Sequence, residues 1–359
     1  MPSDGTTVDA PVPGATVFAT DRLHVLTIVV APQYLDALDT DLDNRVPCAL
    51  TFDGATVQAG IRKKGGYGSN APLAGKTGFS LRFDGTERLD GLARLILNNA
   101  QEDPTFLSET IGYLAYRAAG LPAPLTSHAV VTFNGEDKGI FIVKEPIGRD
   151  FLERNFGASN TGGNVYEGFY HPADLSLGDF ATHPEETDLK DEVSEMRSRA
   201  DLNALAQAIR DTPDAQFEAE IAARLDLDRY ITGFALDTIL GFWDSYAYFR
   251  NNYYLYHLPT SDRFVYVPHG MDQLQYSSPG SPVGLLAQRI RSIATLDARV
   301  DARIASLRAA WPQATLATQI DQVEAILSSP PAGMRTSADT ASFRSEVADV
   351  RARVRALGP

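Results

Sequence analysis

Two carboxylates and one amide stand around a single predicted hairpin. Asp244 follows the end of a helical segment, and Asn252 directly precedes the aromatic strand expected at 253–257. The returning strand, expected at 263–268, leads into Asp272. Because a tight hairpin brings its two ends together, we expect Asn252 and Asp272 to lie close to each other, with Asp244 a short loop upstream. Oxygen-bearing side chains of this kind suit Mg²⁺ or Mn²⁺.

This order of side chains suits phosphoryl transfer. One Asp orients or deprotonates an acceptor hydroxyl, and an Asn and a second Asp hold metal ions against the β- and γ-phosphates of ATP. Protein kinases present the three residues in the same order. Here Asn252 follows Asp244 by eight residues, a longer spacing than in a kinase catalytic loop, and Gln273 stands where the Phe of a D-F-G motif would be. From spacing alone, the alternative that Asp and Asn at these strand ends form turns or caps stays open.

A basic, glycine-rich turn follows the strand expected at 56–63. Its glycines Gly66 and Gly68 allow backbone N–H groups to approach phosphate oxygens closely, which makes both candidate nucleotide contacts. Lys76 opens the next expected strand and is the candidate phosphate-binding lysine, with Glu109 as a possible ion-pair partner. The alternatives are an ordinary turn and a solvated surface lysine.

Two further positions are candidate nucleotide contacts. Lys144 and Glu145 end the strand expected at 139–143, where a nucleotide kinase has its hinge, so that backbone groups would contact adenine and Glu145 would brace the site. Trp243 directly precedes Asp244 and joins the candidate set. The alternative for Lys144 and Glu145 is a surface pair on an edge strand.

The elements that must position these residues change in character along the chain. Strand and hairpin patterns dominate the first half, with Asp-Gly or Asn-Gly turns at 53–54 and 134–135 and one helix at 103–119, which Asp103 would cap and Pro104 would open. Helical patterns, the clearest at 229–242, dominate the second. We predict an α+β fold with a lead-in at 1–19, a β-rich lobe at 20–145, a mainly helical lobe with the embedded hairpin at 146–282, and a helical extension at 283–359. The other expected strands are 23–31, 49–52, 78–83, 93–97 and 128–133.

Charge and composition exclude several classes of protein. The 359 residues carry a formal net charge of −14, which disfavours nucleic acid and anionic membrane surfaces as partners. The single cysteine, Cys48, lies in an apolar run and is expected to be a buried hydrophobe. No apolar stretch reaches about 18 residues, so we expect no membrane span. The first residues show no signal-peptide pattern, and the compartment stays open between the cytoplasm and a surface location with a leader removed.

Several blocks of the sequence resemble the CotH kinase family, which was first seen in bacterial spore coats. They extend over roughly 23–280 and occur in the family's order. The blocks are 62–69 with Lys76 and 79–83; 97–99 with Asp103 and 119–123; 131–136 with 139–145; and 243–246 with 251–256 and 268–272.

The resemblance implies a two-lobed atypical protein-kinase-like fold that uses ATP with Mg²⁺ or Mn²⁺ and phosphorylates Ser or Thr of a protein partner. It implies a catalytic role for Asp244, metal binding by Asn252 and Asp272, and a phosphate contact for Lys76. The sequence departs from the family at Gly270, which replaces the first Asp of an acidic pair. Adenylyl transfer on the same scaffold and a non-catalytic coat or surface protein remain alternatives.

Overall fold

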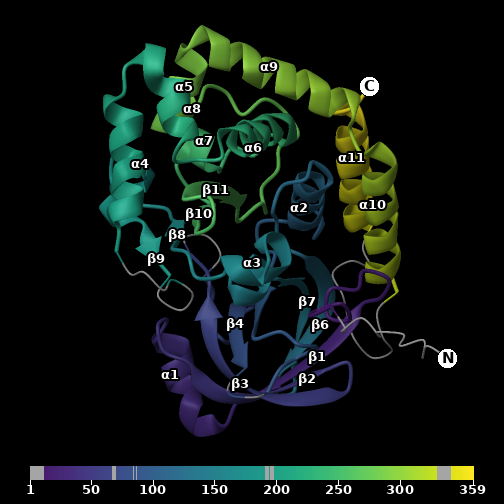
Figure 1. The fold of residues 1–359 in the computed structure, drawn as a ribbon. Coiled ribbons are helices and arrows are strands. Elements are labelled where there is room, and N and C mark those ends of the chain that lie inside the picture. Colours follow the sequence, from purple (N-terminus) through teal and green to yellow (C-terminus); the bar gives the residue numbers. More distant parts are fainter. Residues whose placement is uncertain are drawn as a thin grey trace, which may run out of the picture.

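The computed structural model describes residues 12–66, 70–83, 85, 87–190, 194, 198–329 and 341–359. Within these residues the fold is α+β, as predicted. A closed β-barrel lies at one end of the molecule, and most of the helices gather at the other end around a second, smaller sheet (Figure 1). No helix in the described part of the chain is both long and apolar enough to cross a membrane.

The barrel contains seven strands in the described residues, in the order β1-β2-β3-β4-β5-β7-β6. All neighbours are antiparallel except β1 and β6, which are parallel and close the barrel. The short helix α1 (Leu35–Thr40) joins β1 to β2, and α2 (Ser108–Ala118) joins β5 to β6. The strands are β1 (His24–Val29), β2 (Val46–Phe52), β3 (Ala55–Lys64), β4 (Gly78–Phe83), β5 (Arg94–Asn98), β6 (Thr126–Phe133) and β7 (Glu136–Lys144).

Local turn chemistry explains two hairpins of the barrel. Asp53 and Gly54 have φ values of 47° and 89°, and Asn134 and Gly135 have 47° and 84°. Positive φ at both central residues defines the turn that matches the twist of antiparallel strands, and Asp-Gly and Asn-Gly adopt it readily. Both hairpins were predicted and are confirmed. Alternate side chains of each strand, such as Phe79, Leu81 and Phe83 on β4, fill the barrel together with Cys48.

The second sheet contains four strands among the described residues, in the order β11-β10-β8-β9. The predicted hairpin is confirmed as β10 (Tyr253–Leu258) and β11 (Arg263–Pro268). The sequence did not predict β8 (Val165–Gly168) or β9 (Asp188–Leu189), which extend this sheet beyond β10. These two short strands matter because their side chains border the site described below.

Helices surround the second sheet and share a hydrophobic core with it. The predicted helix at 229–242 is α6 (Leu227–Leu240), which ends at Gly241 in the left-handed conformation (φ 65°). The others are α3 (Arg149–Phe156), α4 (Ala200–Asp211), α5 (Asp214–Ala222), α7 (Tyr246–Phe249), α8 (Leu285–Ser292), α9 (Ala294–Ala309), α10 (Gln313–Leu327) and α11 (Ala341–Ala356). Short 3₁₀ helices lie at Pro32–Tyr34, Ala158–Asn160, Leu175–Gly178 and Pro184–Glu186.

The predicted start of α2 is wrong. We expected Asp103 to cap a helix that begins at Pro104, but α2 begins at Ser108. The Asp103 carboxylate accepts hydrogen bonds from the backbone N–H of Thr105 (3.0 Å) and of Ser108 (2.7 Å). Asp103 therefore organises a separate turn and reaches the helix from outside it. Within that turn Phe106 adopts φ 58°, which a continuous helix does not allow.

Candidate active site

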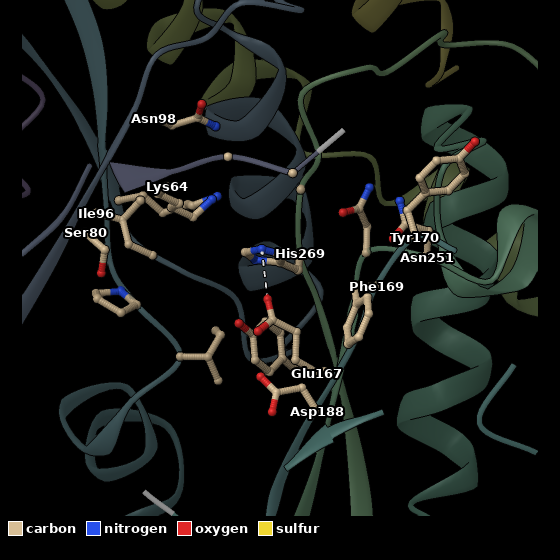
Figure 2. Close-up of a pocket in the computed structure, with 18 of the residues that line it drawn as sticks. Lys64, Ser80, Ile96, Asn98, Glu167, Phe169, Tyr170, Asp188, Asn251 and His269 are labelled. Carbon is tan, nitrogen blue, oxygen red and sulfur yellow. Dashed lines mark ion pairs between the residues drawn. The ribbon is translucent and has the colours of Figure 1, made fainter. Parts of the chain in front are cut away.

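A cavity of about 590 Å³ lies between the barrel and the second sheet. The barrel contributes residues of β3, β4, β5 and β7, and the opposite side comes from β8, β9, β10 and the loops at 244–252 and 269–273. Figure 2 shows Lys64, Ser80 and Ile96 on one side and Phe169, Tyr170 and Asn251 on the other, with His269 and Glu167 between them. The charged and amide side chains that argue for chemistry here are Lys64, Asn98, Lys144, Glu167, Lys190, Asp244, Asn252, His269 and Asp272.

Asp244 is held by the two asparagines that precede β10. Asn252 Nδ2 donates to Asp244 Oδ2 over 2.6 Å, and Asn251 Nδ2 donates to Oδ1 over 3.1 Å. The loop that places these groups contains left-handed backbone at Arg250 (φ 59°) and Asn252 (φ 52°). Burial raises the pKa of Asp244 to about 6, although the two amide hydrogen bonds oppose this effect. Asp244 is thus a carboxylate that two hydrogen bonds hold in place, and its pKa lies close to neutral pH.

Asp272 and Asn252 line the same cavity because the hairpin brings its ends together. Tyr253 pairs with Pro268, and the next residue, His269, donates its backbone N–H to the Asn252 carbonyl over 3.1 Å. Burial raises the pKa of Asp272 to about 7, and the negative charge of Glu109 adds to this effect.

Gly270 is explained by the close approach of these two loops. Its φ is 57°, and a Cβ atom at this position would lie 2.3 Å from Asn252 Oδ1. An aspartate here would collide with the asparagine side chain and would also require left-handed backbone. The cavity geometry therefore accounts for glycine where the resembling family has an acid.

A buried ion pair lies at the barrel side of the cavity. Lys144 Nζ is 2.5 Å from Glu109 Oε1, and the two side chains are 2% and 0% exposed. Glu109 also accepts hydrogen bonds from Asn98 Nδ2 (2.7 Å) and from the Tyr113 hydroxyl (2.8 Å). Burial opposes ionisation of Glu109, but Lys144 and the Tyr113 hydroxyl outweigh this effect, so the pKa of Glu109 is lowered. The expected pairing of Glu109 with Lys76 is wrong, since Lys144 takes that place.

Lys64, at the end of β3, is a second cation in the cavity. Burial lowers the pKa of Lys64 to about 8, and repulsion from Lys144 contributes to this shift. Glu109, Glu167 and Asp272 act on it in the opposite sense, so it faces the acidic groups of the site. The ammonium group of its neighbour Lys63 pairs with Asp39 over 2.8 Å.

The second sheet adds an acid and an imidazole to the site. Glu167 on β8 pairs with Lys190 over 2.7 Å, and its other oxygen lies 3.7 Å from His269 Nε2 (Figure 2). Burial lowers the pKa of His269 to about 3, so the ring is neutral at physiological pH. Burial disfavours the Glu167 carboxylate, but the charge of Lys190 outweighs this effect, and the pKa of Glu167 is lowered to about 2.

Comparison with known proteins gives the family. The family model described as CotH kinase protein matches residues 61–317. The chain belongs to this family. Inner spore coat protein H of Bacillus subtilis (strain 168) is 22% identical over 257 residues, which are 70% of this chain and 68% of that protein. Inner spore coat protein H-like protein of the same strain is 35% identical over 52 residues, 14% of this chain and 17% of that protein.

A solved structure also aligns with this chain. The proinflammatory kinase CtkA of Helicobacter pylori aligns with a TM-score of 0.31 and 12% identity, over 78% of this chain and 92% of that chain. This TM-score is too low to support a conclusion about the present chain. The family assignment therefore depends on the sequence match.

The structure does not bring all the predicted site residues of this CotH family member together. Gly66 and Lys144 line the cavity with Asp244, Asn252 and Asp272. Lys76 does not line it, because its ammonium group lies over the Phe106 and Phe141 rings, 4.8 and 5.1 Å from their centroids. Gly68 lies outside the described residues.

Glu145 and Trp243 also point away from the cavity. The Glu145 carboxylate pairs with Arg154 over 2.5 Å and accepts from the Leu125 N–H over 3.0 Å. The Trp243 ring packs edge-on against Phe249, with centroids 5.3 Å apart. Glu145 therefore braces the segment that leaves the barrel, while its neighbours Lys144, Pro146 and Ile147 line the cavity.

The chemistry of the cavity suits the divalent metal that the CotH kinase family implies. Among the described residues, no group of three or more His, Cys, Asp or Glu side chains is arranged to hold a metal ion. Mg²⁺ in phosphotransferases needs fewer protein ligands than three, because it uses one or two carboxylates together with substrate phosphates and water. Asp272 is a half-buried carboxylate whose pKa is raised, and Asn252 has an amide oxygen left while its Nδ2 donates to Asp244. These oxygens fit such an ion.

Proposed function

We propose that this CotH family protein is an ATP- and divalent-metal-dependent phosphotransferase that phosphorylates Ser or Thr of a protein partner. One observation carries the proposal: Asp244, Asn252 and Asp272 open onto the same cavity as Lys64 and the buried Lys144–Glu109 pair. Metal-binding oxygens and phosphate-binding cations are the two requirements of phosphoryl transfer, since its catalysis is mostly positioning and neutralisation of charge.

Each group has a role in this proposal. Asp244 accepts the proton of the acceptor hydroxyl, and its pKa of about 6 lies close to the range in which a general base is effective. Asn252 and Asp272 would hold the metal, which neutralises charge on the β- and γ-phosphates. Lys64 contacts the phosphates in place of Lys76, and Glu109 keeps Lys144 extended toward them.

The nucleotide base has a suitable place at the edge of the cavity. Ile96, Ile147 and Tyr254 give this edge apolar surface, and the chain from Lys144 to Ile147 leaves the barrel beside it. In this proposal the barrel (20–145) is the nucleotide-binding lobe, 146–282 is the catalytic lobe and 283–359 extends it. That arrangement would be a two-lobed atypical kinase fold with a closed barrel as its first lobe.

The proposal is tested with γ-labelled ATP, Mg²⁺ and generic protein acceptors. Label transfer by the wild type and its loss in Asp244→Asn and Asp272→Asn are the expected results. Asp262→Asn is a matched control, because Asp262 lies in the turn at the far end of the same hairpin and does not line the cavity. Equal transfer by all four proteins would reject the assignment. A parallel reaction with α-labelled ATP separates adenylyl transfer, which alone leaves that label on protein.

A non-catalytic role is the second candidate, and the relative's name favours it. Inner spore coat protein H is named as a coat component, so the present chain could serve a coat or surface structure while keeping the fold. Thermal unfolding with and without ATP and Mg²⁺ separates the two functions. Saturation at 100 times the dissociation constant stabilises a protein by about 2.7 kcal/mol. An unchanged melting temperature at millimolar ATP would support the structural role.

A further inference from the structure

A second pocket lies where the connection between β5 and α2 meets the C-terminal helix α11. Its volume is about 590 Å³, and its lining includes Lys76, Ala100, Phe106, Phe343 and Glu346. Figure 1 shows α10 and α11 beside α2, and α10 contacts α2 directly. None of the lining residues belongs to the candidate active site. The size is within the range of pockets that hold small organic molecules.

The Lys76 ammonium group in this pocket lies over two aromatic rings. It lies 4.8 Å from the Phe106 centroid and 5.1 Å from the Phe141 centroid, and it makes no hydrogen bond or ion pair with any residue that the structure describes. Burial by itself lowers the pKa of Lys76 to about 8. A partly desolvated cation without an anionic partner is unfavourable, and an anion placed beside it would offset that cost.

The remainder of the pocket is suited to an apolar body with one charge. Phe106 and Phe343 are each 3% exposed and contribute aromatic surface, and Ala100 and Pro104 add aliphatic surface. Glu346 also lines the pocket, so a ligand with a second negative charge would meet repulsion. A simple inorganic anion would leave the apolar walls without contacts.

The pocket touches a strained connection that leads to the active site. Ala100 has φ 49° and Phe106 has φ 58°, a backbone region that residues with a Cβ rarely adopt. Asp103 ties this connection to the first turn of α2, and the next residue of that helix, Glu109, holds Lys144. A ligand in contact with both Ala100 and Phe106 would therefore stabilise the start of α2.

We propose that this pocket binds a small monoanionic amphiphile, with its carboxylate on Lys76 and its apolar body against Phe106 and Phe343, and that binding stabilises the connection from β5 to α2. The proposal does not depend on phosphoryl transfer. It gives a function to the lysine that the sequence analysis assigned to phosphate binding and that the structure places elsewhere.

Isothermal titration of the full chain with octanoate and octanamide tests the binding. The two probes have the same length and differ in charge. Octanoate is expected to bind the wild type at least about tenfold more tightly than octanamide, a difference of about 1.4 kcal/mol. Lys76→Met should remove this preference, whereas Arg224→Met should keep it, because Arg224 pairs with Glu220 on the surface and does not line the pocket. Equal affinity of the wild type for the two probes, failure of both to bind at millimolar concentration, or an unchanged preference in Lys76→Met would overturn the proposal.

Hydrogen exchange of the wild type tests the link to α2 and needs no variant. Octanoate is expected to slow exchange of the amides of α2 (Ser108–Ala118) several-fold, and octanamide is not. Exchange that octanoate leaves unchanged would overturn the coupling. If Lys76→Met fails to fold, the comparison of the two probes on the wild type still decides the binding.

Discussion

The buried ion pair of Lys144 and Glu109 allows a quantitative prediction. Replacement of Lys144 by Met keeps the length of the side chain and removes its charge. Glu109, which is 0% exposed, then loses the partner that lies 2.5 Å away. Removal of one member of a buried pair typically costs about 3–5 kcal/mol, because the remaining charge is no longer compensated.

We expect Lys144→Met to lower the free energy of unfolding by about 3 kcal/mol, near the lower end of that range. Glu109 keeps the hydrogen bonds from Asn98 and Tyr113, and Lys64 still acts on it electrostatically. Glu109→Gln should cost a similar amount, since it leaves Lys144 buried without its partner. The double variant should be destabilised by clearly less than the sum, with a coupling energy of about 2 kcal/mol.

Urea unfolding of the four proteins, followed by circular dichroism, measures these differences. The pair of Arg224 and Glu220 is a matched control, because its 2.8 Å contact is on the surface with side chains 38% and 48% exposed. Arg224→Met should cost less than about 1 kcal/mol. The reasoning is refuted if Lys144→Met costs no more than Arg224→Met, or if the two substitutions at the buried pair are additive.

Three further predictions address other parts of the site and the core. Gly270→Ala should destabilise the protein by roughly 2–3 kcal/mol in urea unfolding, because φ is positive and the added Cβ would lie 2.3 Å from Asn252 Oδ1. The control Gly120→Ala should cost only about 1 kcal/mol, because Gly120 has φ 77° but no atom lies within 4 Å of the added Cβ. Burial raises the pKa of Asp237 from 3.8 to about 7, so the stabilisation that its protonated form provides is complete below pH 4 and is lost as pH rises through 7. This loss of unfolding free energy is on the order of 4 kcal/mol, and Asp237→Asn should flatten the pH dependence of the unfolding midpoint. In titration calorimetry Lys64→Met should weaken ATP binding about tenfold or more while Lys76→Met changes it less than about twofold, and equal effects would favour the assignment made from the sequence.

Local chemistry predicted much of the fold. The hairpins at Asp53-Gly54 and Asn134-Gly135 were predictable because those dipeptides adopt positive φ whatever surrounds them. Helix α6 was predictable from its apolar periodicity and its terminal Gly241. Closure of the barrel was not predictable, because the parallel pairing of β1 with β6 joins residues about a hundred positions apart and leaves no local sequence pattern.

The arrangement of the candidate site was predictable where it depends on one hairpin and was missed where it depends on packing. Asn252 and Asp272 flank β10 and β11, so the turn alone brings them to one cavity. Glu167 was missed because β8 has only four residues and acquires its place by pairing with β10. The prediction of Lys76 as the partner of Glu109 was wrong for a similar reason, since Lys144 reaches α2 through the pairing of β7 with β5.

The choice between Lys64 and Lys76 shows what strand alternation can decide. Both lysines flank the glycine-rich turn, and nearness to that turn does not separate them. On β3, Ile61 and Lys63 point to one face and Lys64 to the other, so a cation at Lys64 belongs to the face that borders the cavity. Lys76 precedes the first residue of β4, and strand alternation therefore does not orient it.

Lys64 also lies among the charges of the site. Lys144, the partner of Glu109, repels it, while Glu109, Glu167 and Asp272 attract it. A triphosphate beside Lys64 would relieve that repulsion and would bring its own charge to the oxygens of Asn252 and Asp272, which then need the metal between them. The same electrostatics predict that nucleotide and metal bind with positive coupling, so that ATP affinity measured with Mg²⁺ exceeds that measured in its absence. Equal affinity in both conditions would contradict the assignment of Asn252 and Asp272 as the metal ligands.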